Sequence, residues 1–353
     1  MTSALEMGGA GFVGSHVVDR PDPSSFGTPN PLRVLVTGCA GFIGWKVAEE
    51  LLEAGHRVVG VDNFNDAYDP RLKEWRLAQL RECSGFEFHR IDICDRDGLR
   101  ALFRRGSFDA VVNLAARAGV RPSVEDPWTY YKTNVTGTLN LLELCREHGV
   151  KKFVLASTSS VYGNGERPFR ENQPTDRPLS PYAASKKAAE ALCYTYHHLH
   201  GLDVTVLRYF TVYGPAGRPD MSIFRFIRWI AESEPLSLSG DGSQERDFTF
   251  VDDIARGTLL ALKPLGYEII NLGSDRPASL QRVIAILEKL LEQKARVVYH
   301  PKHPADVPAT WADISKARRL LGWEPQTPLE EGLRRAVEWY LQNRSWVKEV
   351  KLP

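Results

Sequence analysis

A tyrosine and a lysine lie four residues apart in the segment Tyr182-Ala-Ala-Ser-Lys186. On a helix this spacing puts the phenol and the ammonium on one face, one turn apart. A nearby cation stabilises phenolate and lowers the pKa of the tyrosine from its usual value of about 10. Tyr182 is therefore a candidate general base for hydride transfer from a carbinol, and the hydroxyl of Thr158 is a candidate to share the proton. The alternatives are an ordinary surface pair and a Ser/Thr-rich turn, and the combination of the three residues favours the catalytic interpretation.

The motif Gly-x-x-Gly-x-x-Gly occurs twice, once from Gly8 to Gly14 and again at Gly38, Gly41 and Gly44. Such a loop binds a pyrophosphate only between a strand and a helix, because the helix N-terminus presents backbone N–H groups and a positive dipole end. The first copy has too short a segment before it and prolines soon after. The second copy follows LRVLVT and opens the amphipathic segment WKVAEELLEAG. We therefore predict a dinucleotide loop at the second copy, with a simple tight turn as the alternative.

Two carboxylates close later apolar runs. Asp62 stands 18 residues after Gly44, where a carboxylate accepts hydrogen bonds from the adenosine ribose hydroxyls and repels a 2′-phosphate. This spacing predicts NAD rather than NADP, with a solvated loop aspartate as the alternative. Asp92 and Ile93 close the next run and are placed to meet adenine, although Asp92 alone is weak evidence.

Short apolar runs alternate with amphipathic segments up to about residue 210, a rhythm typical of βαβ units and a parallel sheet. Strands buried on both faces are continuously apolar, as VLV, VVGV and KFVLA are here. The predicted class is α/β, a Rossmann doubly wound parallel sheet with a smaller α/β substrate-binding domain. The predicted strands are Leu32–Thr37, Arg57–Asp62, Phe86–Arg90, Ala110–Leu114, Lys152–Ala156 and Val204–Tyr209. The predicted helices are Gly44–Ala54, Val135–His148 and Tyr182–His200.

After about residue 210 Pro, Gly and charged residues become denser, which favours a smaller second domain that covers a ligand. We assign residues 31–207 and about 247–274 to the dinucleotide-binding domain. The substrate-binding domain then comprises residues 208–246 and 275–353. Residues 1–30 end in a stretch rich in Pro, Ser and Gly and are predicted to be a disordered tail.

Composition limits the functional class further. Lys plus Arg is 45 and Asp plus Glu is 44, so the net charge of +1 argues against broad binding to nucleic acid or anionic membranes. No apolar run approaches the roughly 18 residues needed to span a bilayer, and the first residues do not resemble a secretory signal. Five widely spaced cysteines favour reduced thiols in the cytoplasm over disulfides or a zinc site, and we expect no metal site.

Six stretches together resemble the nucleotide-sugar epimerases of the extended short-chain dehydrogenase/reductase family. They are VTGCAGFIG, NLAA, STSSVYG, SPYAASK, RDFTFVDD and ADISKARRLLGWEP, and the resemblance runs from about Leu32 to Pro328. Three more stretches are similar to UDP-glucuronate 4-epimerases: VDNFNDAYDPRLK, AARAGVRPSVEDP and RYFTVYGPAGRPDMSIFRF. The resemblance implies reversible conversion of UDP-glucuronate to UDP-galacturonate through a transient 4-keto sugar and bound NADH. It also implies a homodimer joined by the helices around Val135–His148 and Tyr182–His200.

The resemblance also implies individual roles. Tyr182 takes the proton of the sugar 4-hydroxyl with help from Thr158, and Lys186 holds the nicotinamide ribose. The implied cofactor-binding residues are Gly38, Gly41, Phe42, Ile43, Asp62, Asn63, Asp92, Ile93, Leu114, Ala115, Ala116, Tyr182, Lys186 and Tyr209. The implied substrate-binding residues are Arg121, Thr158, Ser159, Ser160, Thr211, Arg218, Arg246 and Asp306.

Four residues point to a uronate that keeps its carboxylate. In related dehydratases and decarboxylases acidic residues stand near Ser159 and Ser160, whereas this chain has two hydroxyls. A 4-keto glucuronate is a β-keto acid that readily loses CO2, so an epimerase must restrain the carboxylate. Thr211 and Arg218 match the uronate members of the family, and arginine forms bidentate pairs with carboxylates. A solvated loop charge is the alternative for Arg218.

The nucleotide half is matched less completely. Arg246 corresponds to the diphosphate-binding arginine of the family, and Asp306 to the carboxylate that meets the uridine ribose. His303 stands where many members carry arginine, and a neutral histidine is a poorer partner for phosphate above pH 7. Two alternative functions remain: a 4-epimerase of neutral or N-acetylated UDP-hexoses, and a nicotinamide-sensing regulatory protein, which the intact Tyr182 and Lys186 disfavour.

Overall fold

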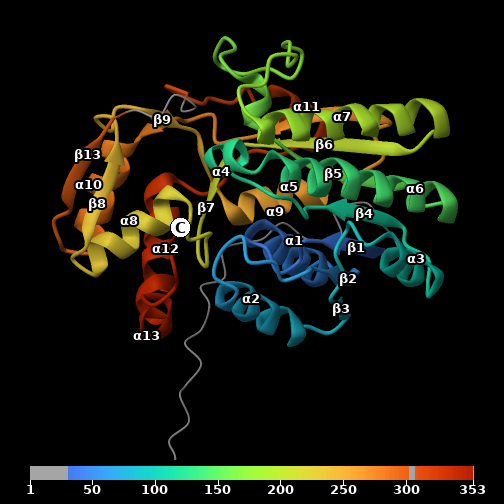
Figure 1. Cartoon of the computed structure of the whole chain (residues 1–353), viewed down its shortest axis with the longest axis horizontal. Helices are drawn as coiled ribbons and strands as arrows, with labels where there is room; N and C mark the ends of the chain where they lie inside the picture. Colours follow the sequence, from blue (N-terminus) through green and yellow to red (C-terminus); the bar gives the residue numbers. More distant parts are fainter. Residues whose placement is uncertain (1–30, 302–306, 353) are drawn as a thin grey trace, which may run out of the picture. The chain divides into compact units, whose positions relative to one another are not determined.

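A seven-stranded sheet forms the centre of the computed structural model, which describes residues 31–301 and 307–352. The strand order is β11-β6-β5-β4-β1-β2-β3, and every pairing is parallel (Figure 1). The strands are β1 (Arg33–Thr37), β2 (Arg57–Val61), β3 (Phe86–His89), β4 (Ala110–Asn113), β5 (Lys152–Thr158), β6 (Asp203–Tyr209) and β11 (Tyr267–Leu272). The predicted α/β class with a doubly wound parallel sheet is confirmed.

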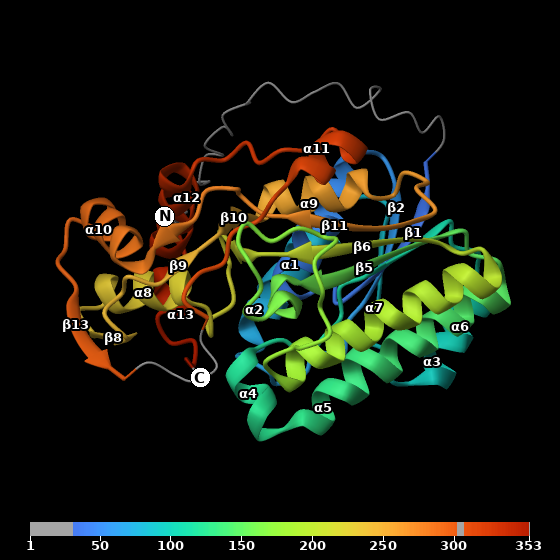
Figure 2. The ribbon, with the colours of Figure 1, turned by 90° about the horizontal axis from the view of Figure 1, so that it is seen from above.

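Helices cover both faces of this sheet, which explains why its strands are apolar throughout (Figure 2). β5, for example, is buried along all seven residues. One face packs against α3 (Arg96–Arg104), α6 (Thr138–His148) and α7 (Pro181–His200). The other face packs against α1 (Phe42–Glu53), α2 (Arg71–Arg81), α9 (Val251–Leu260) and α11 (Ser315–Leu321).

The order of the strands reverses at β1, which has β2 on one side and β4 on the other. In open α/β sheets the crevice at the carboxyl ends of such a pair of strands is where ligands bind. The glycine loop follows β1, and the NLAA segment follows β4. The topology therefore brings the two predicted cofactor segments to one place.

The remaining elements are short and lie mainly in the second half of the chain. Two-stranded sheets pair β7 with β10, β9 with β12, and β8 with β13. Their bounds are β7 (Thr211–Tyr213), β8 (Pro235–Ser239), β9 (Glu245–Arg246), β10 (Phe248–Phe250), β12 (Ala278–Ser279) and β13 (Arg296–His300). The helices are α4 (Val120–Glu125), α5 (Pro127–Tyr131), α8 (Ser222–Ala231), α10 (Leu280–Leu290), α12 (Leu329–Gln342) and α13 (Arg344–Val347).

Two predicted helix starts differ by two or three residues from the structure. α1 begins at Phe42 rather than Gly44, since helix geometry starts inside the glycine motif. A π-helical turn, Lys132–Gly137, precedes α6, so the helix predicted from Val135 begins at Thr138. In that turn the buried Asn134 side chain bonds Arg117 and Ser185 instead of continuing a regular helix face.

A chain of tryptophans connects helices from the two ends of the described sequence. Trp75 of α2 lies edge-on between Trp45 of α1 and Trp339 of α12, with ring centroids 5.4 Å away on each side. Trp346 of α13 continues the chain at 6.1 Å from Trp339. These contacts pack α12 and α13 against the start of the Rossmann sheet.

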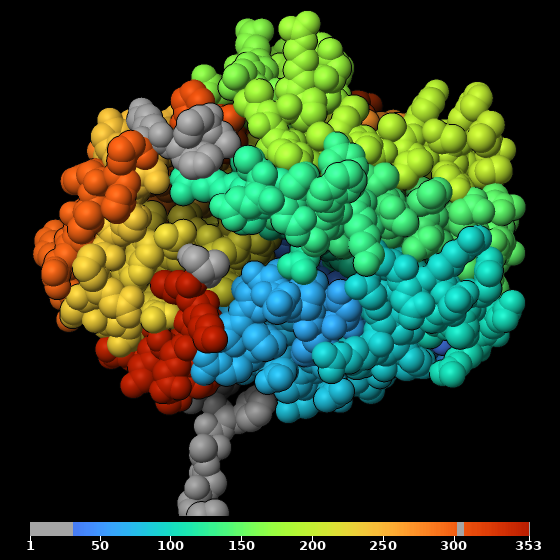
Figure 3. Space-filling model, in the orientation of Figure 1, coloured from blue at the N-terminus to red at the C-terminus, as the bar shows by residue number. Residues whose placement is uncertain are grey.

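The C-terminal segment also bonds the start of α2. The backbone N–H of Lys351 donates to Asp69 Oδ2 at 3.1 Å, and Arg71 Nη2 donates to the carbonyl of Glu349 at 2.6 Å. In the space-filling view the red C-terminal segment lies against the light-blue region of α2 (Figure 3). Hydrogen bonds from Arg71 lower the pKa of Asp69 to about 2 although burial opposes them.

From Pro31 onward the chain forms one compact unit, and its predicted division into two domains stays a prediction. The predicted tail, residues 1–30, lies outside the described residues, as does the Gly8 copy of the glycine motif. Within residues 31–301 and 307–352, none of the helices combines the length and the apolar character that a bilayer crossing requires.

Candidate active site

The glycine loop turns sharply between β1 and α1. Gly38 has a φ of +69°, and a Cβ there would lie 2.8 Å from the backbone nitrogen of Ala115. A Cβ at Gly41 or Gly44 would meet the carbonyl of Gly38 at 2.9 or 2.0 Å. No side chain caps α1 at Gly41, so its first N–H groups stay open to an anion. The loop therefore has the close backbone approach that a pyrophosphate site needs.

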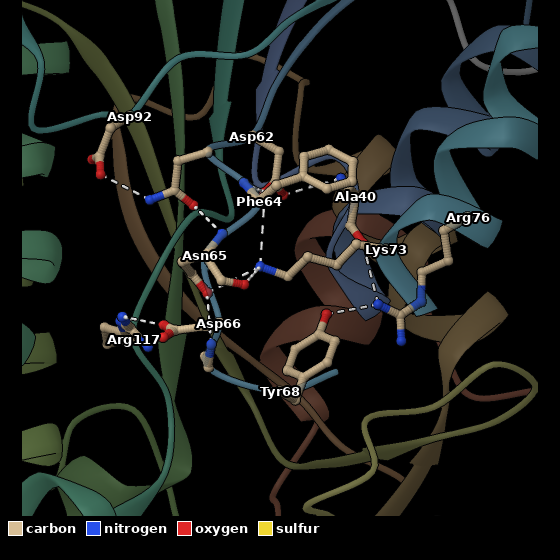
Figure 4. Close-up of polar contacts among 12 residues, drawn as sticks. Ala40, Asp62, Phe64, Asn65, Asp66, Tyr68, Lys73, Arg76, Asp92 and Arg117 are labelled. Carbon is tan, nitrogen blue, oxygen red and sulfur yellow. Dashed lines mark hydrogen bonds and ion pairs between the residues drawn. The ribbon is translucent and has the colours of Figure 1, made fainter. Parts of the chain in front are cut away.

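Asp62 follows β2 directly beside this loop and is 7% exposed. Its Oδ2 accepts the N–H of Ala40 at 3.2 Å, and its Oδ1 accepts the N–H of Phe64 at 2.8 Å (Figure 4). Lys73 Nζ lies 3.9 Å from Oδ1. Because a carboxylate offers about four acceptor positions, Asp62 retains capacity for ribose hydroxyls.

Asp92 lies farther along the same edge of the sheet. Its Oδ2 accepts Asn63 Nδ2 at 2.8 Å, and its Oδ1 accepts the N–H of Cys94 at 2.8 Å. Burial alone would raise the pKa of Asp92, but the hydrogen bonds from Cys94 and Asn63 outweigh it and lower the pKa. The group is therefore an ionised acceptor at neutral pH.

The predicted catalytic residues come from β5 and α7. Thr158 is the last residue of β5, rather than lying just past it as predicted. Tyr182 stands in the first turn of α7, which begins where Ser180 Oγ accepts the N–H of Ala183 at 3.2 Å. One turn later the buried Lys186 donates from Nζ to the carbonyl of Ala156 at 2.9 Å. The spacing of four residues on α7 thus places the side chains of Tyr182 and Lys186 next to the end of β5.

The expected lowering of the Tyr182 pKa by Lys186 is wrong for this arrangement. Burial raises the pKa of Tyr182, and the opposing contributions come from a hydrogen bond with Thr158 and from the charge of Arg218. Burial also lowers the pKa of Lys186 to about 8, although the charge of Glu190 opposes the shift. The sequence pattern omitted desolvation, which is the largest effect on both groups.

The serine pair begins the 3₁₀ turn Ser159–Tyr162 that follows β5. The backbone N–H of Ser160 donates to Thr158 Oγ1 at 3.1 Å, and Thr158 Oγ1 donates to Ser160 Oγ at 3.2 Å. Hydroxyls rather than carboxylates therefore surround the predicted proton-sharing group.

Arg218 reaches the same region from the loop after β7. Its Nε donates to Asp220 Oδ1 at 3.0 Å, and its Nη2 donates to Asp220 Oδ2 and to the carbonyl of Ala118 at 3.3 Å. Burial alone would lower the pKa of Arg218, but Asp220 reverses the shift and raises it. Thr211, at the start of β7, is fixed by its N–H, which donates to the carbonyl of Asp247 at 3.0 Å. The Arg218 guanidinium is thus fixed by Asp220 and Ala118 and stays charged beside Tyr182.

These residues line one large cavity. Its volume is about 360 Å³, which lies within the roughly 300–1,000 Å³ typical of a ligand-binding pocket. Every predicted cofactor-binding residue lines it, as do Thr158, Ser159, Ser160, Thr211 and Arg218. The cavity thus joins the dinucleotide loop to the predicted catalytic residues.

Two of the predicted substrate-binding residues that the structure describes are not brought together there. Among the described candidates, Arg121 and Arg246 lie outside the cavity lining. Arg121 Nη2 donates to Ser239 Oγ at 3.3 Å, and Arg246 lies on β9, beside the segment Pro308–Thr310, which bonds Glu245. Asp306 and His303 lie outside the described residues.

Three residues of the stretch VDNFNDAYDPRLK, which begins at the last residue of β2, had no role assigned from the sequence. Asn65, Tyr68 and Lys73 all line the cavity, and Lys73 Nζ donates to the carbonyl and Oδ1 of Asn65 at 2.9 and 3.0 Å (Figure 4). Burial lowers the pKa of Lys73 to about 8, and the charge of Asp62 opposes the shift. The available signal was that Lys73 and Arg76 share a helix stripe with Leu72, Leu77 and Leu80, all of them buried.

A family model described as the NAD dependent epimerase/dehydratase family matches residues 34–273, well over half of the chain. The chain belongs to this family. A UDP-glucuronate 4-epimerase of Thermodesulfobacterium geofontis is 60% identical over 319 residues, which cover 90% of this chain and 99% of that protein.

Solved structures of the family have the same fold. A UDP-glucuronic acid 4-epimerase of Bacillus cereus, in complex with UDP-glucuronic acid and NAD, is 40% identical with a TM-score of 0.84. It is matched over 88% of this chain and 100% of that one. A UDP-glucose 4-epimerase of Thermotoga maritima with UDP-glucose is 34% identical with a TM-score of 0.81, over 89% and 100% of the two chains.

The site fits the dinucleotide that the family name implies. A Cβ at Gly38, Gly41 or Gly44 would collide with the backbone of Ala115 or Gly38, so the tight turn of a dinucleotide loop requires glycine at these positions. Asp62 and Asp92 supply anionic acceptors at the ends of the next two strands, and they disfavour a 2′-phosphate nearby. Residues predicted to hold the adenosine half and residues predicted to be catalytic therefore line the same cavity.

Proposed function

We propose that the protein is an NAD-dependent isomerase that interconverts UDP-glucuronate and UDP-galacturonate by inverting carbon 4. The carrying observation is that Thr158, Tyr182 and Lys186 share one cavity with Arg218, which can pair with a sugar carboxylate. The 60% identical relative is named UDP-glucuronate 4-epimerase and matches nearly its whole length. The expected family, enzyme class and cofactor are confirmed by these findings.

Tyr182 acts as the general base in this proposal. Its phenolate form takes the proton of the 4-hydroxyl. Burial raises the pKa of this group, whereas the hydrogen bond with Thr158 and the charge of Arg218 favour the phenolate. Lys186 holds a positive charge one helix turn away. NAD, when bound, accepts the C4 hydride and returns it to the opposite face of the sugar. The same phenol then gives its proton to the oxygen of the 4-keto group as the hydride returns to C4, which forms the new 4-hydroxyl and restores the phenolate.

Arg218 restrains the carboxylate of the substrate in this proposal. The 4-keto sugar is a β-keto acid, and its decarboxylation places developing negative charge on the sugar carbon as the carboxylate loses its charge. A guanidinium that pairs with the intact carboxylate opposes that loss. The hydroxyls of Ser159 and Ser160 add donors without a carboxylate that would repel the substrate.

We further propose a homodimer formed through α6 and α7, in the cytoplasm. Apolar side chains stay exposed on these helices, with Leu199 64%, Tyr194 53% and Leu139 36% accessible. An exposed apolar stripe on a helix pair is typical of an interaction surface. All five cysteines are free thiols, which supports a reducing compartment.

The direct test incubates the purified protein with UDP-glucuronate, without added NAD, and follows the sugar by NMR. UDP-galacturonate is the expected product, and its formation establishes both the activity and NAD retained through purification. If the first incubation gives no product, it is repeated with added NAD. Product in the second incubation shows that the cofactor was lost during purification, and no product shows that the protein lacks the activity. Formation of UDP-xylose and CO2 contradicts the role assigned to Ser159 and Ser160. Epimerisation of UDP-glucose alone supports the neutral-hexose alternative.

A further inference from the structure

Arg76 is a fully buried arginine in the middle of α2 that lies outside the cavity lining. Its Nη1 donates to the carbonyl of Ala40 at 3.1 Å and to Tyr68 Oη at 2.7 Å. Its Nε and Nη2 both donate to the carbonyl of Ala216, at 3.1 and 2.6 Å. Nη2 also donates to the carbonyl of Gly217 at 3.2 Å. Figure 4 shows the guanidinium between Ala40 and Tyr68.

The backbone carbonyls that accept from Arg76 belong to two different parts of the site. Ala40 lies inside the glycine loop, and its N–H is bonded by Asp62. Ala216 and Gly217 directly precede Arg218. One guanidinium therefore connects the loop that fits a dinucleotide to the turn that carries the carboxylate-binding arginine.

Only an arginine can make this connection. Among the described residues, every hydrogen-bond acceptor of Arg76 is a neutral carbonyl or hydroxyl oxygen. A buried charge is costly unless its donors are satisfied, and the planar guanidinium presents five N–H donors in a fixed fork. A lysine carries its donors on one nitrogen, so it cannot reach Ala40 on one side and Ala216 on the other.

The turn that Arg76 holds is under backbone strain. Ala216 is fully buried and has a φ of +50°, a left-handed conformation that disfavours residues with a Cβ. Such conformations persist where the surrounding structure imposes them. The two N–H groups that converge on the Ala216 carbonyl supply that constraint, and the next residues set where Arg218 starts.

We propose that Arg76 is a positioning residue that fixes the Ala216–Gly217 turn relative to the glycine loop and thereby aims Arg218 at the sugar carboxylate. The inference rests on the proposed function, because it gives Arg218 the substrate carboxylate as its partner. It predicts that Arg76 governs the preference for a uronate over a neutral sugar, although it touches neither ligand.

The test compares Arg76→Lys with Arg256→Lys as a matched control. Arg256 is a half-buried helix arginine that donates to the backbone carbonyl of Glu324 and to Asp253 Oδ1, and it bonds neither loop. Titration calorimetry with saturating NAD measures the Kd of UDP-glucuronate and of UDP-glucose for each protein. We expect R76K to weaken UDP-glucuronate binding about tenfold, a loss of about 1.4 kcal/mol, with UDP-glucose changed less than about twofold. R256K leaves both within about twofold.

A double-mutant cycle separates positioning from general destabilisation. In an Arg218→Ala background, R76K is expected to have no further effect on the preference, because the group that it positions is gone. The proposal is overturned if R76K loses affinity equally for both UDP-sugars, or if the losses of affinity from R76K and Arg218→Ala are additive in the cycle. If R76K does not fold, Arg76→Gln removes the buried charge and gives the same readout. Failure of both to fold while R256K folds assigns Arg76 a purely structural role and also overturns it.

The outcomes distinguish this inference from the proposed function. A wild-type protein that binds UDP-glucuronate more tightly than UDP-glucose and yet forms no UDP-galacturonate contradicts the proposed function. In that case calorimetry still measures the role of Arg76. Wild-type protein that binds both sugars equally contradicts the inference directly. Where the enzyme is active, R76K is expected to raise the KM for UDP-glucuronate while kcat stays within about twofold.

Discussion

Arg218 is shared between Asp220 of its own loop and, in the proposed function, the carboxylate of the substrate. The two hydrogen bonds to Asp220 hold the guanidinium plane in one orientation, so part of the ordering cost of substrate binding is met before the sugar arrives. The same contact means that any substrate carboxylate approaches a guanidinium whose charge Asp220 already partly balances. Recognition of the uronate thus depends on geometry as well as on net charge.

Arg218→Ala is expected to weaken UDP-glucuronate binding about tenfold to a hundredfold, as removal of charge-assisted hydrogen bonds typically does. The change also leaves Asp220 unbalanced next to the sugar carboxylate. UDP-glucose affinity should change less than about threefold, and the comparison of the two ligands by calorimetry is the measurement. An equal loss for both ligands contradicts the role assigned to Arg218.

Lys73 predicts a pH effect on stability. An unfolded lysine has a pKa of about 10.4, whereas burial lowers the pKa of Lys73 to about 8. Between these values the unfolded chain binds a proton that the folded chain has released, so stability rises as pH increases from 8 towards 10. Urea midpoints at pH 7 and pH 9.5 measure the gain.

Lys73→Met should reduce that gain in stability, since it removes the titrating group. Lys289→Met, a change at an exposed position of α10, serves as the control and should leave the pH dependence unchanged. A pH dependence that is the same in K73M and wild type contradicts the assignment of Lys73. The comparison is needed because burial lowers the pKa of Lys186 to about 8 as well.

At the scale of elements, the glycine loop is built by close backbone approach. Gly38 and Gly149 have the same φ of +69°, but a Cβ at Gly38 meets the backbone of Ala115 while a Cβ at Gly149 meets nothing within 4 Å. Gly38→Ala should therefore yield protein with little or no bound NAD. Gly149→Ala carries the same backbone strain, about 1 kcal/mol of stability, and should retain NAD. The measurement is the amount of NAD that each variant releases on denaturation, determined by absorbance.

The predictable part of the site consists of local patterns. Gly38 and Asp62 belong to the β1–α1–β2 unit, and Tyr182 and Lys186 lie one turn apart on α7, so local spacing in the sequence indicates their positions. Arg76 could not be found in this way, because its partners Ala216 and Gly217 lie 140 residues and more away in the chain. The direction of the Tyr182 pKa was also beyond the pattern, since burial depends on the whole surrounding fold.

At the scale of the whole molecule, the exposed side chains of α7 predict the oligomeric state. Replacing Tyr194 and Leu199 together by Asp should convert the proposed homodimer to a monomer of 39.6 kDa, because charge in an apolar interface is costly. Leu341→Asp changes another exposed apolar residue, on α12 (45% exposed), and should leave the dimer intact. Light scattering after size exclusion gives the mass. A monomeric wild-type protein, or a double variant that stays dimeric, contradicts the assigned interface.

The row of indole rings formed by Trp45, Trp75, Trp339 and Trp346 gives the chain an optical reporter of its own. Edge-to-face rings at 5.4–6.1 Å fix their mutual orientation, and fixed aromatic packing is what near-ultraviolet circular dichroism detects. If α12 and α13 separate from α2, this signal falls while the far-ultraviolet signal of the seven-stranded sheet persists. Because Trp75 is the neighbour of Arg76 in α2, the same band also monitors the helix that joins the two loops of the site.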